Sequence, residues 1–407
     1  MADNRIPKHW QTKKLGEVCN VLDNLRKPIN SVERQKRISG KKEKDLFPYY
    51  GATGQVGWID SFITDSEYIL VGEDGAPFLD LFKDKAYKIK GRTWVNNHAH
   101  ILEGKRNIIL NDFALYYLNS INYREFVNGT TRLKLTKSNL VDIPFVVPLL
   151  PEQKAIVSKI EELLSDLENG KQQLQTAQQQ LKVYRQSLLK AAFEERVTNK
   201  NADEKELPKR WKIESMDKVT SKITDGEHLT PKRITQGEML LSAKNVRNGY
   251  IDYSNYDNIS KSDFDKCLLR CNPEVGDILI VSVGATIGRA SIVRDNRKFA
   301  LVRSVALLKP SAKLESKYLL YFIQAPQTQK RIQELSQGSA QNCLYINKIK
   351  LIEIPFPSII DQNIIVNELE SKLTVCDKIE ETINQSLQQA ETLRQSVLKK
   401  AFEGKLI

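Results

Sequence analysis

The sequence RQSLLKAAFE at residues 185–194 returns as RQSVLKKAFE at residues 394–403, with eight of the ten positions identical. The two stretches belong to a longer match, in which residues 152–198 align with residues 361–407 without a gap, at an offset of 209 positions and with 15 identities in 47. Helix-rich composition raises the number of chance matches, but it does not produce such a run. The chain is therefore built from an internal repeat, which predicts its architecture.

The segments before the two matching stretches also correspond, although mainly at their edges. Residues 6–10, IPKHW, correspond to residues 207–211, LPKRW, and Ile143-Pro144-Phe145 corresponds to Ile354-Pro355-Phe356. Between these markers the similarity nearly vanishes. The predicted plan is a variable globule, a helical segment, a second globule and a second helical segment, at residues 1–150, 151–206, 207–357 and 358–407. Because the globules have diverged while the helices still match, the two halves are expected to have the same kind of function with different targets.

The positive charge of the chain is concentrated in the two globules. The 407 residues carry a formal net charge of +12. By segment, the globules carry +6 and +9, and the helical segments carry −1 and −2. Two basic bodies joined by near-neutral segments predict contacts with a polyanion at two places.

Both helical segments place apolar residues at alternating steps of four and three, the pattern of a helix that packs along one seam. In the first segment the seam consists of Ile156, Ile160, Leu163, Leu167, Leu174, Leu181, Tyr184 and Leu188. In the second it consists of Ile365, Leu369, Ile379, Ile383, Leu393 and Val397. Leu373, Leu387 and Leu398 lie one place along and shift the second stripe. We expect the two helices to pack on each other as an antiparallel coiled coil, and pairing with another subunit is the alternative use of the same stripes.

Each globule combines short β-rich runs, turn-rich connections and helical stretches, which predicts an α+β domain. Lys and Arg contact phosphates, whereas Asn, Gln and Arg can form paired hydrogen bonds with base edges. Residues of these types cluster in the loop-like parts of both globules, and together they favour DNA contact over a merely solvated surface. The candidate DNA-binding residues are Arg34, Lys36, Arg37, Lys41, Lys42, Asn96, Asn97, His98, Arg132, Lys134, His228, Lys232, Arg233, Lys244, Asn245, Arg247, Asn248, Gln341 and Asn342.

The sequence contains no pattern that supports catalysis by this chain alone. It has no Walker A loop and no set of nucleophile, base and orienting group. Its four His and five Cys show no metal-ligand spacing, so we expect no metal, no cofactor bound by this chain, and reduced thiols. No apolar run approaches the ~20 residues of a membrane helix, and the N-terminus lacks a cleavage pattern. We therefore expect a cytoplasmic protein with no membrane partner.

Taken together, these residues resemble the specificity subunit of type I restriction-modification enzymes, over essentially the whole chain. The resemblance is carried by the two openings at 6–10 and 207–211, by the two Ile-Pro-Phe exits with Pro151-Glu152-Gln153, by the paired Arg-Gln-Ser endings, and by residues 225–231, DGEHLTP. The first globule departs from the second at this last position, where residues 24–29 stand instead. Such a departure is expected if the first globule belongs to another subtype.

The resemblance implies a non-catalytic DNA-recognition subunit. Each globule would be an α/β target recognition domain that reads one half of a bipartite, interrupted site in double-stranded DNA. The helices would set the spacing between the half-sites and dock two methyltransferase subunits. These partners would use S-adenosylmethionine, and two motor/nuclease subunits would use ATP and Mg. The residues leave one alternative open, a non-catalytic coiled-coil adaptor with non-specific polyanion binding.

Overall fold

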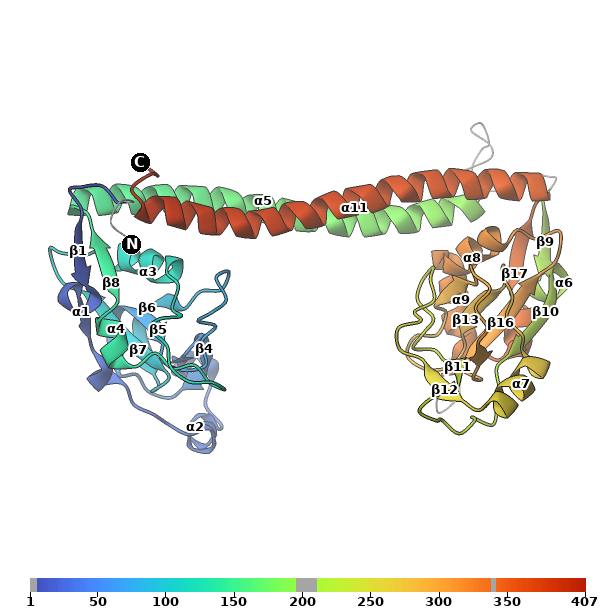
Figure 1. The fold of residues 1–407 in the computed structure, drawn as a ribbon, viewed down its shortest axis with the longest axis horizontal. Coiled ribbons are helices and arrows are strands. Elements are labelled where there is room, and N and C mark those ends of the chain that lie inside the picture. Colours follow the sequence, from blue (N-terminus) through green and yellow to red (C-terminus); the bar gives the residue numbers. More distant parts are fainter. Residues whose placement is uncertain (1–5, 195–210, 338–341) are drawn as a thin grey trace. The chain divides into compact units, whose positions relative to one another are not determined.

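The computed structural model describes residues 6–194, 211–337 and 342–407. The chain divides into two compact units (Figure 1). Unit 1 comprises Met1–Thr176 and Ile383–Ile407, and unit 2 comprises Ala177–Thr382. Each unit contains one sheet-rich globule and parts of the two long helices, α5 (Leu150–Phe193) and α11 (Ile359–Phe402). The predicted class, two α/β globules joined by two long helices, is confirmed.

Unit 1 is built on a six-stranded sheet with the order β2-β7-β5-β6-β3-β4, next to a two-stranded sheet of β1 and β8. β3 and β6 pair in parallel, and the other pairs are antiparallel. The strands are β1 (Gln11–Lys14), β2 (Cys19–Val21), β3 (Phe47–Gly51), β4 (Gly54–Ile59), β5 (Thr64–Gly72), β6 (Ala86–Val95), β7 (Ala99–Gly104) and β8 (Pro144–Val147). The helices before α5 are α1 (Leu15–Val18), α2 (Ser31–Ile38), α3 (Asn111–Ser120) and α4 (Lys137–Val141).

Unit 2 has a four-stranded sheet with the order β10-β16-β13-β14, a three-stranded sheet of β12, β11 and β15, and a two-stranded sheet of β17 and β9. The strands are β9 (Lys212–Ser215), β10 (Thr220–Asp225), β11 (Glu238–Leu241), β12 (Asp257–Ile259), β13 (Ile278–Val281), β14 (Ala290–Ile292), β15 (Ala300–Leu301), β16 (Val305–Pro310) and β17 (Glu353–Phe356). The helices before α11 are α6 (Met216–Val219), α7 (Lys261–Arg270), α8 (Ser316–Gln324), α9 (Pro326–Ser336) and α10 (Ile346–Lys350).

The sequence repeat continues into the sheets, although the residues differ. Four strands of unit 1 follow the order β2-β7-β5-β6, and their counterparts in unit 2 follow the matching order β10-β16-β13-β14. Just beyond β5, Asp74 forms an isolated bridge with Lys134, and just beyond β13, Val283 forms one with Cys343. Each residue of the second bridge lies 209 positions after its counterpart, which is the offset of the helical repeat. The two globules therefore share this four-stranded scaffold and differ in the strands around it and in the side chains on it.

A buried glutamine near the start of each long helix joins that helix to its globule by hydrogen bonds. Gln153 is fully buried, and its amide donates to the carbonyls of Ile108 and Pro148, both at 2.9 Å, while its Oε1 accepts from the Leu110 amide at 2.9 Å. Gln362, the repeat counterpart, is also fully buried and makes the same three kinds of bond in unit 2. These bonds fix the direction in which α5 and α11 leave their sheets.

Within each unit, α5 and α11 run side by side in opposite directions (Figure 1). In unit 1, Lys171 pairs with Glu391 at 2.7 Å, and in unit 2, Arg185 pairs with Asp377 at 2.7 Å and Glu380 at 3.0 Å. The buried members of the predicted seams are Ile156, Ile160, Leu181, Leu188, Ile365, Leu369, Ile383 and Val397, and Leu163, Leu167 and Leu174 are half-buried. Antiparallel contact between the helices therefore accounts for most of both stripes.

Three predicted seam residues depart from this pattern. Tyr184, Ile379 and Leu393 are exposed by 51%, 44% and 54%. In each case the residue that follows in the sequence is half-buried instead. These following residues are Arg185, Glu380 and Arg394. The expectation of burial is wrong at these three positions, because charged residues that can form ion pairs occupy the seam there instead of the apolar neighbour.

Two further expectations concern reduced thiols and the lack of a membrane-spanning helix. Cys19, Cys267, Cys271 and Cys376 are buried free thiols, and Cys343 is partly exposed. Burial raises the pKa of Cys19 and Cys271 to about 12, so neither forms a thiolate at neutral pH. Among the described helices, none is both long enough and apolar enough to cross a membrane.

Candidate DNA-recognition surfaces

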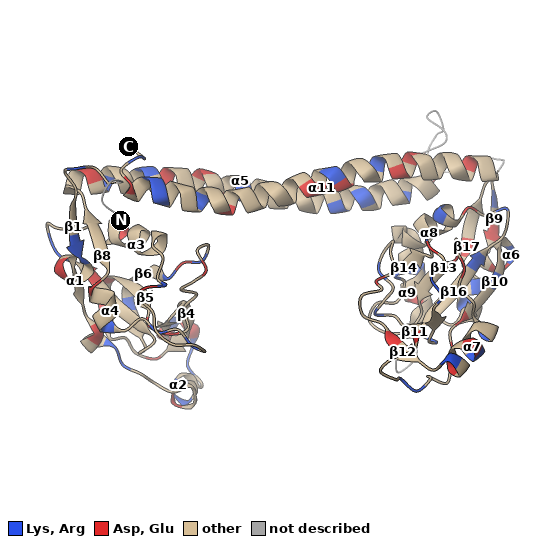
Figure 2. Ribbon diagram, viewed as in Figure 1, with Lys and Arg blue, Asp and Glu red and all other residues tan. Residues whose placement is uncertain are grey.

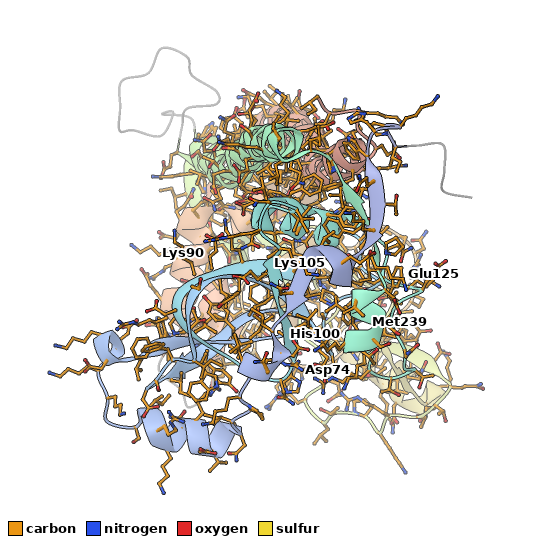
Figure 3. The ribbon with its side chains drawn as sticks, turned by 90° about the vertical axis from the view of Figure 1, so that its left-hand side faces the viewer. Asp74, Lys90, His100, Lys105, Glu125 and Met239 are labelled. Atoms are coloured by element: carbon orange, nitrogen blue, oxygen red, sulfur yellow. The ribbon has the colours of Figure 1, made fainter. Side chains whose placement is uncertain are left out.

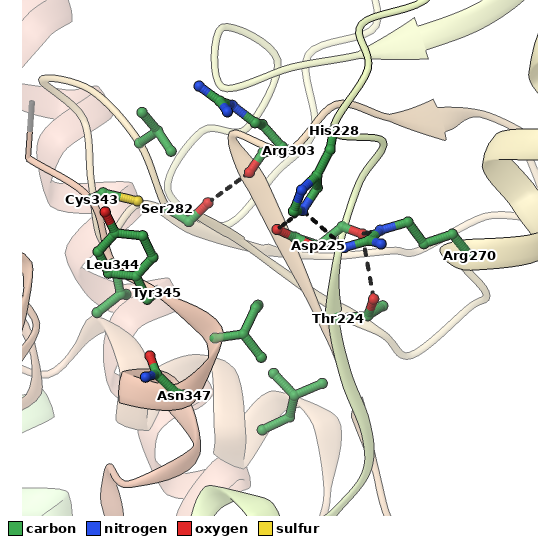
Figure 4. A pocket seen from close by; sticks show the side chains of 13 residues that line it. Thr224, Asp225, His228, Arg270, Ser282, Arg303, Cys343, Leu344, Tyr345 and Asn347 are labelled. Atoms are coloured by element: carbon green, nitrogen blue, oxygen red, sulfur yellow. Dashed lines mark hydrogen bonds and ion pairs between the residues drawn. The ribbon is translucent and has the colours of Figure 1, made fainter.

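A cleft of about 980 Å³ opens in unit 2 where β10 ends and α10 begins (Figure 4). Its polar lining comes from several elements that are distant in sequence, so only the folded chain assembles it. The residues that line it are Ile223, Thr224, Asp225, His228, Arg270, Ser282, Val283, Arg303, Cys343, Leu344, Tyr345, Ile346 and Asn347.

One wall of the cleft is a carboxylate shared by an imidazole and a guanidinium. Asp225, the last residue of β10, lies 2.6 Å from Arg270 Nη2 and 2.9 Å from His228 Nε2. Arg270 Nη2 also lies 2.9 Å from His228 Nε2. The Nε2 atom of His228 therefore donates a hydrogen bond to Asp225 when it carries a proton, and it accepts one from Arg270 when it does not. The hydrogen bond to Asp225 raises the pKa of Arg270. The group is thus a fixed arrangement of donors and acceptors at the mouth of the cleft.

The loop that carries His228 requires the glycine of the DGEHLTP segment. A Cβ added at Gly226 would lie 2.2 Å from the carbonyl oxygen of Leu301, so a larger residue cannot approach this closely. Next to it, the Glu227 carboxylate accepts from the backbone amides of His228 and Leu229 at 2.9 and 3.3 Å. This local geometry accounts for the glycine and the glutamate of the segment.

Three further residues of the cleft present groups that suit a nucleic acid. Arg303 is exposed, and within the described part of the chain no carboxylate pairs with its guanidinium. Tyr345 is 56% exposed and offers a ring for stacking, and Asn347 offers an amide on α10. An unneutralised cation, an aromatic ring and an amide can contact phosphate, a base face and a base edge respectively.

The same place on the unit 1 scaffold is filled by an ionic network. Glu73, the counterpart of Ser282, pairs with Arg26 and with Lys134, whose Nζ is 3.0 Å away. Arg26 also pairs with Asp23 at 3.1 Å, and Asp23 accepts a bond from buried His100 at 2.7 Å. Burial alone would raise the pKa of Glu73, but the hydrogen bonds from Arg26 and Lys134 outweigh it and lower that pKa. Unit 1 therefore has a charged network at the position where unit 2 has a cleft.

Asp74 borders this network and repeats the chemistry of Asp225. Its Oδ1 lies 2.7 Å from His98 Nδ1 and 2.7 Å from Arg132 Nη2. Figure 3 shows Asp74 and His100 in the part of unit 1 that lies away from α5. His98 and Arg132 remain 41% and 61% exposed, so both side chains can still meet a ligand.

The basic cluster around α2 divides into two sets. Arg34 lies over the ring of Tyr49 at 4.8 Å and donates to the carbonyl of Val56 at 3.2 Å. Arg37 lies over the ring of Trp94 at 5.1 Å, and both Arg37 and Lys41 pair with Asp60, at 2.6 and 2.8 Å. Lys36 and Lys42 are in the second set and form no ion pair within the described residues.

In unit 2, two carboxylates organise the predicted cations between β10 and α7. Asp257 accepts from Arg233 at 2.7 Å and from Lys244 at 2.9 Å, and these bonds hold the pKa of Asp257 below its usual value. Arg247 pairs with Asp252 at 3.3 Å. In Figure 2, Lys and Arg are intermixed with Asp and Glu over both globules, as these pairs require.

Two predicted base contacts are structural. Asn96 is 7% exposed and accepts from the His98 amide, and Asn245 is 1% exposed and bonds to Ser242, Asp252 and Asn255. As base-reading residues these two predictions are wrong, because both amides are used inside the protein. Asn97, Lys232, Asn248 and Asn342 are exposed, and Gln341 lies outside the described residues.

Sequence reasoning missed the acids that hold the cations and several members of the unit 2 cleft. Asp60, Asp74 and Asp257 each bind two basic groups, yet a search for cations overlooks them. Arg303 stands alone in the sequence, without a cluster around it, and Tyr345 is an aromatic residue beside the predicted Gln341 and Asn342. The DGEHLTP segment is a sequence signal for this cleft, and the candidate residue that it supplies is His228.

Comparisons with known proteins agree with this architecture. The family model described as "Type I restriction modification DNA specificity domain" matches residues 7–176 and 217–389. A putative type I restriction enzyme specificity subunit of Haemophilus influenzae, S.HindORF215P, is 30% identical over 386 residues, covering 93% of this chain and 91% of that protein. The EcoBI specificity subunit of Escherichia coli is 30% identical over 305 residues, covering 71% of this chain and 64% of that protein.

Solved structures show the same fold at lower identity. A chain from a structural study of complex assembly and conformational transition of the type I R-M system matches with a TM-score of 0.69 at 18% identity, covering 98% of this chain and 99% of that one. The HsdS subunit from Thermoanaerobacter tengcongensis matches with a TM-score of 0.59 at 18% identity, covering 99% of each chain. These comparisons do not support the adaptor alternative. With the family model matching both halves and a full-length relative at 30% identity, the chain belongs to the DNA specificity subunits of type I restriction-modification enzymes.

Proposed function

We propose that this chain reads a bipartite, interrupted site in double-stranded DNA, with one half-site read by each globule. In this proposal, residues 1–150 and 207–357 are the two target recognition domains, and residues 151–206 and 358–407 form the helical spacers. One observation carries the proposal. The two globules share a scaffold, but at the same strand ends unit 1 presents an ionic network around Glu73 and unit 2 presents an open cleft around Asp225. A common frame with different surface chemistry suits two readers of different sequences.

The remaining exposed candidates complete the proposed surface. Once the buried amides are set aside, the side chains available to DNA are those that are exposed or only partly engaged in ion pairs. In unit 1 these are Lys36, Lys41, Lys42, Asn97, His98, Arg132 and Lys134, and in unit 2 they are His228, Lys232, Arg233, Lys244, Arg247, Asn248, Arg303, Asn342 and Tyr345. Lys and Arg would set the salt dependence, and the amides would contribute to base choice.

Specificity subunits are non-catalytic components of type I restriction-modification complexes, so the chemistry belongs to partners. In our proposal two methyltransferase subunits dock on the helices and use S-adenosylmethionine, and two motor/nuclease subunits use ATP and Mg. Support comes from apolar side chains that the helix pair leaves in solvent. In unit 2, Val183 and Tyr184 on α5 and Val375 and Ile379 on α11 are 44% to 66% exposed. Such residues on long helices favour a further protein partner.

The test is to express the chain with its methyltransferase subunit and to sequence the DNA of the host for modified adenines. The expected result is one interrupted motif with two fixed halves and a spacer of constant length. Modification spread over unrelated sequences, or confined to a continuous motif, would contradict the proposal. A matched expression without the specificity chain is the control, because it should give no sequence-specific modification.

A further inference from the structure

The helix α2 projects from unit 1 without burying any of its eight residues. A short helix of this kind gains little from packing, so something else has to hold it. The cation–π contacts of Arg34 with Tyr49 and of Arg37 with Trp94, together with the Arg37–Asp60 ion pair, supply that attachment. Its two arginines therefore serve as anchors on the side that faces the protein.

The ends of α2 are also defined. The side chain of Asn30 accepts from the Glu33 amide at 2.8 Å and caps the N-terminus. After the helix, Gly40 has φ +75°, a left-handed conformation that turns the chain away. Gly57 of β4 leaves room for the anchor, because an added Cβ there would lie 2.5 Å from Arg34 Nη1. The helix is thus preformed before any partner arrives.

The outward face of α2 is polar with one apolar residue at its centre. Ser31, Val32, Gln35, Lys36 and Ser39 surround a shallow surface depression of about 530 Å³. Their spacing places them on one face of the helix. Val32 is 78% exposed, and within the described residues the side chains of Gln35 and Lys36 have no hydrogen-bond or ionic partner. The acid in the helix, Glu33, falls outside this face.

We propose that α2 enters the major groove of the half-site read by unit 1, and that Gln35 and Val32 select an A·T pair there. An α-helix fits the major groove, a Gln amide can bond to both N6 and N7 of adenine, and an apolar side chain can contact the thymine methyl group. Lys36 and Lys42 contact the flanking phosphates. Five cations against one acid in residues 31–42 favour DNA over a protein groove, and the one exposed apolar residue is too small a patch for protein docking.

This inference rests on the proposed function and reassigns part of the basic cluster. Arg34 and Arg37 become positioning residues, since their guanidinium groups are occupied beneath the helix. Base choice passes to Gln35 and Val32, which a search for cations does not select. Lys36 contributes affinity without sequence preference.

The experiment uses the full chain with its methyltransferase subunit and compares wild type with Gln35→Ala, Val32→Ala and the double variant. Both side chains are exposed, so the variants should fold, and circular dichroism verifies this. The expected result is relaxed base preference at one or two adjacent positions of one half-site, by about 5- to 150-fold for Gln35→Ala. The other half-site and the spacer should be unchanged. Gln333→Ala, on the exposed side of α9 in unit 2, is the matched control and should preserve the whole motif.

Two outcomes separate this inference from the function on which it rests. If the wild-type complex modifies no interrupted site, the proposed function fails. If the wild type reads such a site but the double variant keeps its full preference at every position of both halves, the function stands and the assignment of α2 is overturned. Lys36→Ala should weaken binding to all sequences and reduce the salt slope by about 1.

Discussion

The ring of Phe402, near the end of α11, packs edge-on against Phe113 of α3, with centroids 5.2 Å apart and an interplanar angle of 76°. The relationship repeats in unit 2, where Phe193 of α5 packs against Phe322 of α8 at 5.5 Å and 78°. Phe193 and Phe402 belong to the two matching stretches, and Phe113 and Phe322 are also 209 positions apart. Each repeated stretch thus ends by inserting an aromatic ring into the core of a globule, and the end of α11 completes the first globule of the chain.

Loss of this ring should loosen one unit and spare the other. Phe402→Ala should cost unit 1 about 3–5 kcal/mol, because it leaves a cavity beside α3. Amide hydrogen exchange in the full chain should then accelerate in α3 and stay slow in α8. Phe193→Ala is the matched variant, with the reverse pattern expected. Equal acceleration in both helices after either change would contradict the separate cores.

Removal of the buried glutamine at a helix start should weaken its attachment to the globule. Gln153→Ala leaves the Leu110 amide and two carbonyls without their partner, at a cost of about 1–3 kcal/mol for each group left buried and unsatisfied. Faster exchange of amides in the first turns of α5 would show the loss. Gln362→Ala should do the same for α11, whereas Gln172→Ala, at an exposed position of α5, should have no such effect. Unchanged exchange at residue 110 would refute this role.

The ionic network of unit 1 should make that unit acid-sensitive. Burial raises the pKa of Glu73, but bonds from Arg26 and Lys134 lower it overall, from an ordinary value of 4.5. A lowered pKa in the folded state means that the stabilisation is complete above pH 4.5 and is lost as the pH falls through the folded-state pKa. Glu73→Gln should therefore reduce the stability of unit 1 at pH 7. It should also make that stability less dependent on pH below pH 4.5. Unfolding followed across this range tests the sign, with exposed Glu125→Gln as the control.

The guanidinium of Arg303 in the unit 2 cleft, which has no carboxylate partner among the described residues, should contribute to DNA affinity. Arg303→Ala should weaken binding and reduce the slope of log affinity against log salt by about 1, as expected for one lost phosphate contact. A salt titration of the assembled complex measures this slope. Lys330→Ala, an exposed cation on α9, is the matched control and should leave the slope unchanged. Equal effects of both substitutions would indicate a general charge effect and argue against a role for the cleft.

The helices should act as a ruler for the spacing between half-sites. Seven residues inserted after Leu174, with a matching heptad near Ser386 of α11, lengthen the pair by about 10 Å while keeping the seam in register. At about 3.4 Å per base pair, the recognised spacer should grow by about three base pairs, or recognition should be lost, with both half-site preferences intact. Sequencing of modified host DNA gives the spacer length directly. A spacer of unchanged length would rule out the ruler.

Much of the architecture could be predicted from the order of residues because it depends on local periodicity and repetition. The seams of Ile156 and Ile365 follow the helical period, and the offset of 209 positions links helices, sheets and the two Phe pairs. The departures at Tyr184, Ile379 and Leu393 arose where a charged neighbour found an ion partner. No periodic pattern reports such a partner.

The candidate site could be predicted far less well, because the role of a cation depends on which acid the fold brings beside it. Arg37 reaches Asp60 across 23 positions, Lys134 reaches Glu73 across 61, and Arg303, with an equal formal charge, has no carboxylate partner among the described residues. In sequence these three look alike. Only the packing of strands distant in the chain separates anchors from free contacts, since a Coulombic pair forms at a distance of a few ångströms in space, whatever the separation along the chain.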